Sequence, residues 1–285
     1  MADVFRAIAF GASGFERTIA LKVLRREFVG DSTLERMFAE EARLQAQLTH
    51  RCLVAAHDTG VADGLPWVRL DYMNGGALEG LLTRAGPLSE ALGRRIGAEI
   101  ALGLHVLHQA HDEQQRQLGL VHRDVTVSNV LLTMEGEVKL ADFGIARATL
   151  MRQQTRGGIR KGTANAMSPE QVAGERLTSA SDIFSLAGLV IELLTCHRPF
   201  ESATTVETLD RIRAATQPTL DGVPPALKAI LTQALQREPH VRPSALQLRA
   251  ALLTGAADEL ELAAFIAQRS QSHGHESLPS PPVGA

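Results

Sequence analysis

The chain has 285 residues, of which 45% are hydrophobic and 21% are charged, and its formal net charge is −3. This is the profile of an ordinary globular protein, long enough for one large domain or for two lobes that share a core. A charge balance so close to zero gives no reason to expect a basic surface, so we expect no nucleic-acid partner.

Nothing in the sequence predicts secretion or membrane insertion. The chain does not open with a basic segment followed by an apolar one. The longest apolar stretch, residues 186–194, is interrupted by a glycine and a glutamate and is far shorter than the roughly 20 residues of a membrane span. Cys52 and Cys196 match no metal or disulfide spacing, and we interpret both as small buried side chains in a reducing compartment. We therefore expect a cytoplasmic protein without a membrane segment.

The first quarter of the chain predicts a small sheet. Four short runs are rich in aliphatic and β-branched residues, and we expect each to be a strand. They are residues 4–10, 17–23, 53–59 and 66–71. The glycine-containing residues 11–14 predict a turn between the first two strands. Apolar residues recur at helical spacing over residues 34–48, which predicts one helix in this part.

The rest of the chain predicts a larger, mainly helical part. Asn74-Gly75-Gly76 is typical of a linker, and residues 88–110 have the pattern of a long helix. Two short β-like runs turn at Glu135-Gly136 and predict a hairpin. From residue 179 onward the pattern is helical, with loops marked by proline. The domain prediction begins with a lobe at residues 1–73, a hinge-and-linker segment at 74–76 and a helical lobe at 77–255. A C-terminal helix at 256–270 and a disordered tail at 271–285 follow.

Four short motifs follow one another along the chain. ALKVL contains Lys22, and Glu41 follows 19 residues later inside the predicted helix. VHRDVTVSNVLL contains Asp124, ADFGIAR contains Asp142 18 residues later, and SPE ends at Glu170, 28 residues further on. Each motif alone is weak, because a lysine–glutamate pair is usually a surface salt bridge and an isolated HRD is usually a polar loop. Their shared order and spacing leave little room for chance.

Together these motifs resemble the protein-kinase family, and specifically the bacterial serine/threonine kinases of eukaryotic type, also called Hanks-type kinases. The resemblance covers residues 1–253. It implies an α+β, bilobal fold, with a small antiparallel β-sheet and one helix in the N-lobe and a larger, mainly helical C-lobe. It also implies a transferase that uses ATP and Mg²⁺ and moves the γ-phosphate of ATP to serine or threonine hydroxyls of protein substrates.

The resemblance assigns a role to each residue of the central set. Lys22 would pair with the α- and β-phosphates of ATP and be held by Glu41. Asp142 and Asn129 would supply oxygen ligands to Mg²⁺, a hard cation that keeps water and phosphate in its shell. Asp124 would accept the proton of the substrate hydroxyl.

The adenine site is also implied by the resemblance. Its walls and hinge would be formed by Val4, Ala20 and Leu131 around the ring, by Leu70 as gatekeeper, and by the backbone from Asp71 to Met73. Two further features would be structural, namely an ion pair between Arg242 and Glu170 and a brace from Asp182 to the backbone of the catalytic loop.

The segment between the last two motifs would be an activation loop. Arg123 directly precedes Asp124, which in this family often means that a phosphorylated threonine orders the loop. Thr155 is the best-placed acceptor and Thr149 the next. A kinase dimer that phosphorylates itself in trans would fit such a device.

One part of the family pattern is missing from the sequence. Residues 1–7 resemble the second half of the glycine-rich phosphate loop, so the first strand and the leading glycines are absent from the predicted N-lobe. Either the start is an internal methionine of a longer protein, which we favour because the family pattern has a methionine there, or the truncation is real. In the second case the alternative function is a pseudokinase-like scaffold that binds nucleotide weakly. The intact central set favours the enzyme.

Overall fold

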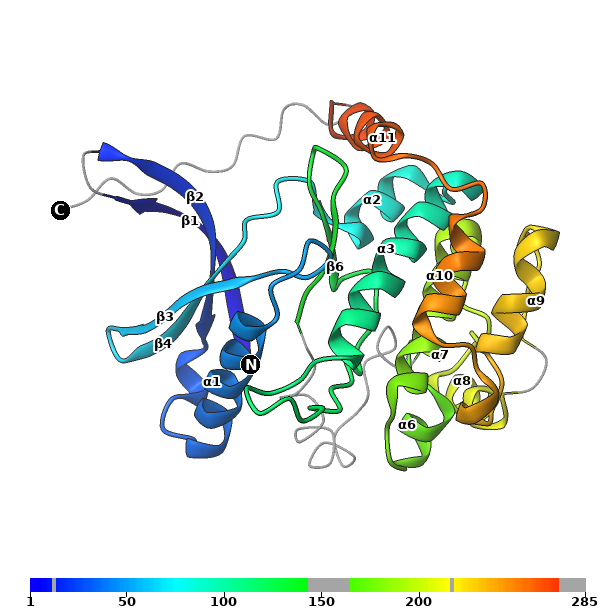
Figure 1. The fold of residues 1–285 in the computed structure, drawn as a ribbon, viewed down its shortest axis with the longest axis horizontal. Helices are drawn as coiled ribbons and strands as arrows, with labels where there is room; N and C mark the ends of the chain where they lie inside the picture. Colours follow the sequence, from blue (N-terminus) through cyan, green and yellow to red (C-terminus); the bar gives the residue numbers. More distant parts are fainter. Residues whose placement is uncertain (12–13, 143–164, 216–217, 272–285) are drawn as a thin grey trace.

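The protein folds into two lobes that meet at a short linker. The computed structural model describes residues 1–11, 14–142, 165–215 and 218–271 (Figure 1). A sheet and one long helix form the N-terminal lobe, and a larger set of helices forms the C-terminal lobe. The predicted α+β, bilobal architecture is therefore confirmed.

The N-lobe contains a four-stranded antiparallel sheet with the strand order β1-β2-β4-β3. Its strands are β1 (Ala2–Phe10), β2 (Glu16–Leu24), β3 (Ala56–Ala62) and β4 (Leu65–Leu70). β1 pairs with β2 along its whole length, with Ala2 opposite Leu24 and Phe10 opposite Glu16. This pairing confirms the two predicted strands, while residues 12–13 of the predicted turn lie outside the described residues.

The strand predicted at residues 53–59 is wrong at its start, because β3 begins at Ala56. The preceding residues pair with the C-lobe instead of the N-lobe sheet. The Leu140 N–H donates to the Cys52 carbonyl at 2.8 Å, and the Val54 N–H donates to the Leu140 carbonyl at 3.0 Å. Periodicity cannot separate these two partners, since both need extended, apolar backbone.

The single helix of the N-lobe is α1 (Ser32–Gln47), preceded by a short 3-10 turn at Arg26–Phe28. The Asp31 carboxylate accepts the N–H groups of Thr33 and Leu34 and so caps the helix. The buried side chains of α1 include Leu34, Phe38 and Glu41. One face of the helix is thus packed on the sheet, and the Glu41 carboxylate lies on this buried face.

The C-lobe combines a small sheet with a core of helices. The strands β5 (Gly76–Ala77), β6 (Val130–Leu132) and β7 (Val138–Leu140) form a three-stranded antiparallel sheet in that order. The helices are α2 (Leu78–Ala85), α3 (Glu90–His108), α6 (Pro169–Ala173), α7 (Ser179–Thr195), α8 (Thr205–Ala214), α9 (Pro225–Ala234), α10 (Ala245–Leu253) and α11 (Glu259–Gln271). The predicted linker glycine Gly76 is the first residue of β5.

The core of the C-lobe is built around α7, which is buried on nearly all sides. α3 packs along it, and Gly97 allows close approach, because a Cβ there would lie 2.7 Å from the Val190 side chain. No helix in the described ranges is long and apolar enough to cross a membrane. The expectation that Cys196 is buried is wrong, because this residue ends α7 in the left-handed conformation, with φ +59°, at an exposed position.

A buried ion pair joins the start of α6 to the segment before α10. Arg242 donates to both Glu170 carboxylate oxygens, at 2.8 and 2.9 Å. Its remaining N–H groups donate to the carbonyls of Ala180, Gln236 and Arg237. The guanidinium also lies over the Phe184 ring, 5.0 Å from its centroid. Every donor of this buried cation is therefore satisfied, which is the condition under which such a pair is tolerated.

We expect Arg242→Ala to lower the free energy of unfolding by about 3 kcal/mol or more, because it leaves the Glu170 carboxylate buried without its partner. Urea unfolding at neutral pH measures this loss. The matched control is Arg213→Ala, which removes an exposed pair with Asp210 on α8 and should cost less than about 1 kcal/mol. Equal losses in the two variants would contradict the prediction.

Candidate active site

The centre of the candidate site is the ammonium group of Lys22, which lies between two carboxylates. Lys22 projects from β2, and its Nζ is 2.9 Å from Glu41 Oε1 on α1 and 2.5 Å from Asp142 Oδ1 after β7. Glu41 is only 6% exposed, whereas the Asp142 side chain is 45% exposed. A single cation therefore links a strand and a helix of the N-lobe to the C-lobe.

The charges of this cluster shift the pKa values of its members. Burial alone would lower the pKa of Lys22, but the carboxylates of Asp142 and Glu41 outweigh it and hold that pKa well above its ordinary value. Burial raises the pKa of Glu41, and the charge of Asp142 adds to this effect, because one ammonium is shared between two acids. Lys22 therefore stays protonated, and its charge is shared between Glu41 and Asp142.

The loop at residues 121–129 brings Asp124 and Asn129 together. The Asn129 side-chain amide donates to the Asp124 carboxylate at 2.7 Å and to its carbonyl at 2.8 Å. The Asn129 N–H donates to the Thr126 carbonyl, and its carbonyl accepts from Ala141 N–H. The bond to Ala141 fixes Asn129 next to Asp142, so the two expected metal-binding residues are neighbours.

Asp182, in the first turn of α7, binds the backbone of this loop. Its carboxylate, in a residue only 1% exposed, accepts the N–H groups of His122 and Arg123, each at 2.8 Å. The ring of His108 on α3 contacts the same carboxylate at 2.8 Å. A buried carboxylate with three hydrogen-bond partners is a rigid anchor, and the contacts to the loop backbone are those that the sequence led us to expect.

Two residues of the site have backbone conformations that side chains rarely adopt. Arg123 has φ +70° and Asp142 has φ +54°. The Gln171 amide on α6 donates to the Arg123 carbonyl at 2.8 Å and supports the first of these. Such strain persists only where the surroundings fix it, and it often marks functional positions.

His122 is fully buried and is held as a neutral ring. Its Nε2 lies 3.0 Å from the Ala141 carbonyl, and its Nδ1 accepts the Asp124 N–H at 3.4 Å. These contacts assign the proton to Nε2, because Nδ1 must stay unprotonated to accept. Burial lowers the pKa of His122, despite the nearby charge of Asp182.

The expected hinge has its side chain tied to both lobes. The Asp71 carboxylate contacts Nε2 of His57 on β3 at 2.7 Å and Nζ of Lys139 on β7 at 3.1 Å. Although burial opposes the shift, these partners hold the pKa of Asp71 below its ordinary value. The Asp71 N–H donates to Ala55, and the Met73 carbonyl accepts from Gly76. The Asp71 carbonyl and the Met73 N–H carry no hydrogen bond within the described ranges.

Four side chains expected around the adenine ring come from both lobes. Ala20 lies opposite Leu70, and Val4 lies opposite Lys22, so alternate residues of β1, β2 and β4 share one face of the sheet. Ala20 and, from β6, Leu131 pack against the same apolar cluster. Val4 stays 58% exposed and outside that cluster. The structure therefore places Ala20, Leu70 and Leu131 at one apolar cluster, while Val4 is exposed to solvent.

The donor atoms at the site fit a hard divalent cation that keeps other ligands. Within the part of the chain that the structure describes, no three His, Cys, Asp or Glu side chains converge as a metal site. Asp142 and Asn129 offer a carboxylate and an amide oxygen. This set suits Mg²⁺, which usually takes one or two protein oxygens and completes its shell with water and phosphate.

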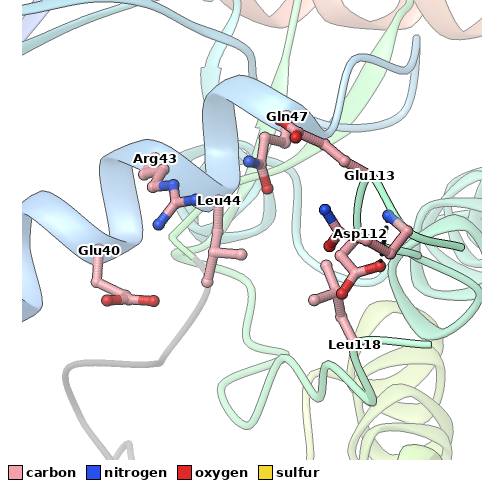
Figure 2. A pocket seen from close by; sticks show the side chains of 8 residues that line it. Glu40, Arg43, Leu44, Gln47, Asp112, Glu113 and Leu118 are labelled. Atoms are coloured by element: carbon pink, nitrogen blue, oxygen red, sulfur yellow. Dashed lines mark hydrogen bonds between the residues drawn. The ribbon is translucent and has the colours of Figure 1, made fainter. Parts of the chain in front are cut away.

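A polar cavity of about 230 Å³ lies outside this cleft (Figure 2). It is formed by the outer face of α1, with Glu40, Arg43 and Gln47, and by the loop that contains Asp112 and Glu113. On the helix these residues recur at positions i, i+3 and i+7, on the side away from Glu41. The cavity therefore does not share the charged cluster of Lys22.

Several residues and contacts of the candidate site were not predicted from the sequence. They are His122 as a buried ring, Gln171 as a support of Arg123, and the contacts of His57 and Lys139 with Asp71. Of these, only His122 could have been found in the sequence, because it is the first residue of the HRD motif. The expected phosphorylation sites Thr149 and Thr155 lie outside the described residues.

The lowered pKa of His122 predicts that stability falls as the pH drops below about 6.5, the ordinary value for histidine. Below that pH the unfolded chain takes up a proton that the folded ring resists, so this residue alone contributes a slope of up to about 1.4 kcal/mol per pH unit. Urea unfolding between pH 7.5 and pH 5.5 measures the slope. His122→Phe should flatten it, and an unchanged slope in that variant would refute the assignment.

Comparisons with known proteins agree with this geometry. Residues 4–252 match the family model of the protein kinase domain. Serine/threonine-protein kinase PknL of Mycobacterium tuberculosis is 36% identical over 254 residues, which cover 88% of this chain and 62% of the relative. Tyrosine-protein kinase MasK of Myxococcus xanthus is 34% identical over 252 residues, which cover 85% of this chain and 39% of the relative.

Serine/threonine-protein kinase PknA of Mycobacterium tuberculosis is 33% identical over 233 residues, with 79% of this chain and 52% of the relative covered. The chain thus spans between about two fifths and three fifths of the length of these curated relatives. The family match covers both lobes and every residue of the cluster around Lys22. The chain belongs to the protein kinase family.

Proposed function

We propose that this chain is an ATP- and Mg²⁺-dependent serine/threonine protein kinase. The observation that carries the proposal is the position of Lys22, whose ammonium contacts Glu41 and Asp142 at once. Phosphoryl transfer needs positioning and charge neutralisation more than covalent chemistry. A largely buried cation next to a half-exposed carboxylate, at the junction of two lobes, supplies both.

In this proposal Lys22 binds the α- and β-phosphates of ATP while Glu41 holds it in place. The adenine ring lies between the sheet face at Ala20 and the C-lobe side chain Leu131. The Asp71 carbonyl and the Met73 N–H, which carry no hydrogen bond to the described residues, are an acceptor and a donor of the kind that recognises a purine edge. Val4 covers the outer side of the ring.

Asp142 and Asn129 would hold Mg²⁺. The ion neutralises phosphate charge that builds up during transfer. Asp124 orients the acceptor hydroxyl and takes its proton. The amide of Asn129, which donates to the Asp124 carboxylate, orients that carboxylate.

The acceptor in this proposal is a serine or threonine hydroxyl of a protein. Two of the relatives are named serine/threonine-protein kinases, and one is named a tyrosine-protein kinase. The Gly162-Thr163 step of the sequence supports serine and threonine, as in the bacterial kinases that the chain resembles.

We also propose that a phosphothreonine in the activation segment docks on Arg123. Nε of this arginine is buried, and within the described ranges no acceptor lies within hydrogen-bond distance. A phosphate with three acceptor oxygens would satisfy it. Thr155 is the first candidate and Thr149 the second, modified in trans within a transient dimer.

Incubation with Mg²⁺ and ATP should place phosphate on serine or threonine residues of the chain, located by mass spectrometry. Asp124→Asn should lower the rate by about 100-fold or more, because it removes the proton acceptor. An unfolding curve like that of the wild type shows that the variant is folded. Equal phosphorylation of the two proteins would contradict the role of Asp124, and no phosphate on either would favour a nucleotide-binding scaffold.

Thr155→Ala should remove the main phosphate of the segment and lower the rate on an added protein substrate by about tenfold, the value of one charge-assisted hydrogen bond. Arg123→Gln should cause a similar loss and make the Thr155 substitution neutral. Thr149→Ala is the matched control and should retain most of the activity. A fully active Thr155→Ala protein without phosphate in the segment would exclude this regulation.

A further inference from the structure

The last described helix lies outside the region that matches the family. α11 spans Glu259–Gln271, whereas the match ends at residue 252. Its side chains Leu262 and Ile266 are nevertheless 0% and 1% exposed, within the main core of the C-lobe. Figure 1 shows α11 above α2, beside the turn of the hairpin β6–β7. The helix is therefore an integral part of the fold.

The start of α11 is fixed by charge and capping contacts. The Asp258 carboxylate accepts the Glu261 N–H at 2.8 Å, and the Glu261 carboxylate accepts the Asp258 N–H at 2.9 Å. This reciprocal arrangement is a capping box. Glu259 adds an ion pair with Arg95 of α3 at 3.3 Å. The first turn of the helix is thus held against α3.

One side of the hairpin turn lies directly against this first turn. Gly136 has φ +91°, and a Cβ built on it would be 2.3 Å from the Glu259 carbonyl oxygen and 3.1 Å from the Ala263 N. No side chain fits in that space without a shift of α11. At the far end of the helix, the Ser270 hydroxyl contacts the Met134 sulfur at 3.8 Å.

The other side of the same turn holds the linker between the lobes. The Met134 N–H donates to the Asn74 side-chain oxygen at 2.8 Å, and the Asn74 amide donates to Glu135 at 3.4 Å. The Gly75 N–H donates to the Leu132 carbonyl at 3.0 Å. The hairpin turn is therefore placed between α11 and the residues that directly follow the hinge.

We propose that α11 is a brace that presses the hairpin turn against the linker and so positions the hinge backbone and Leu131 for the nucleotide. Gly136 and Asn74 are the positioning residues on the two sides of the turn. This inference rests on the proposed function, since it assigns the nucleotide to the cleft beside the hinge. It adds a requirement for a helix beyond the matched kinase region.

The first test replaces Gly136, because only glycine fits at this contact with α11. Gly136→Ala should displace α11, raise the Kd for Mg²⁺-ADP by roughly threefold to tenfold in calorimetry, and speed amide hydrogen exchange in α11 and at residues 74–76. The matched control is Gly64→Ala in the β3–β4 turn, which has φ +74° and nothing within 4 Å of an added Cβ. It carries the same backbone strain and should leave both readouts unchanged.

Asn74→Ala provides the second variant, because it cuts the contact to the hairpin without touching α11. It should raise the Kd and the exchange at residues 74–76 while exchange in α11 stays as in the wild type. An unchanged Kd and linker exchange in either folded variant would overturn the brace. If the wild type does not bind Mg²⁺-ADP, the proposed function fails, and the exchange at residues 74–76 alone decides whether α11 braces the linker.

Discussion

The ammonium of Lys22 is the contact on which the relation between the lobes depends. It joins β2 to α1 through Glu41, and it joins both to the C-lobe through Asp142. The Glu41 carboxylate is buried and depends on this cation for its partner, whereas the Asp142 side chain is 45% exposed and keeps contact with water. In the proposed function, a nucleotide phosphate would compete for the same charge, so its binding would redistribute this contact.

The C-lobe supplies the fixed frame for that change. Asp182 binds the backbone on the N-terminal side of Asp124, and Asn129 binds Asp124 from the other side. Asp182 lies on α7, which is buried on nearly all sides, and Asn129 directly precedes β6. The strained conformation of Arg123 is possible because this frame holds it.

The sequence predicted the two-lobe fold, because the strands and the long helices have strong local signals, and its motifs named Lys22, Glu41 and Asp142, which the structure places in contact. It could not predict that residues 52–54 pair with β7, since extended apolar backbone suits either lobe. The contacts of Asp71 with His57 and Lys139 join three separate segments and leave no periodic trace. The exposure of Cys196 could not be inferred from its residue type, because it follows from the position of this residue at the end of α7.

The burial of α11 also has a consequence for how the protein is made. Leu262 and Ile266 fill a core whose other members begin near Leu48. On a ribosome that adds about 5–20 residues per second, the N-lobe sheet emerges seconds before the helix that completes the C-lobe. Until then the hairpin turn at Gly136 lacks its contact with α11, and the apolar C-lobe surface that Leu262 and Ile266 cover in the finished fold is exposed.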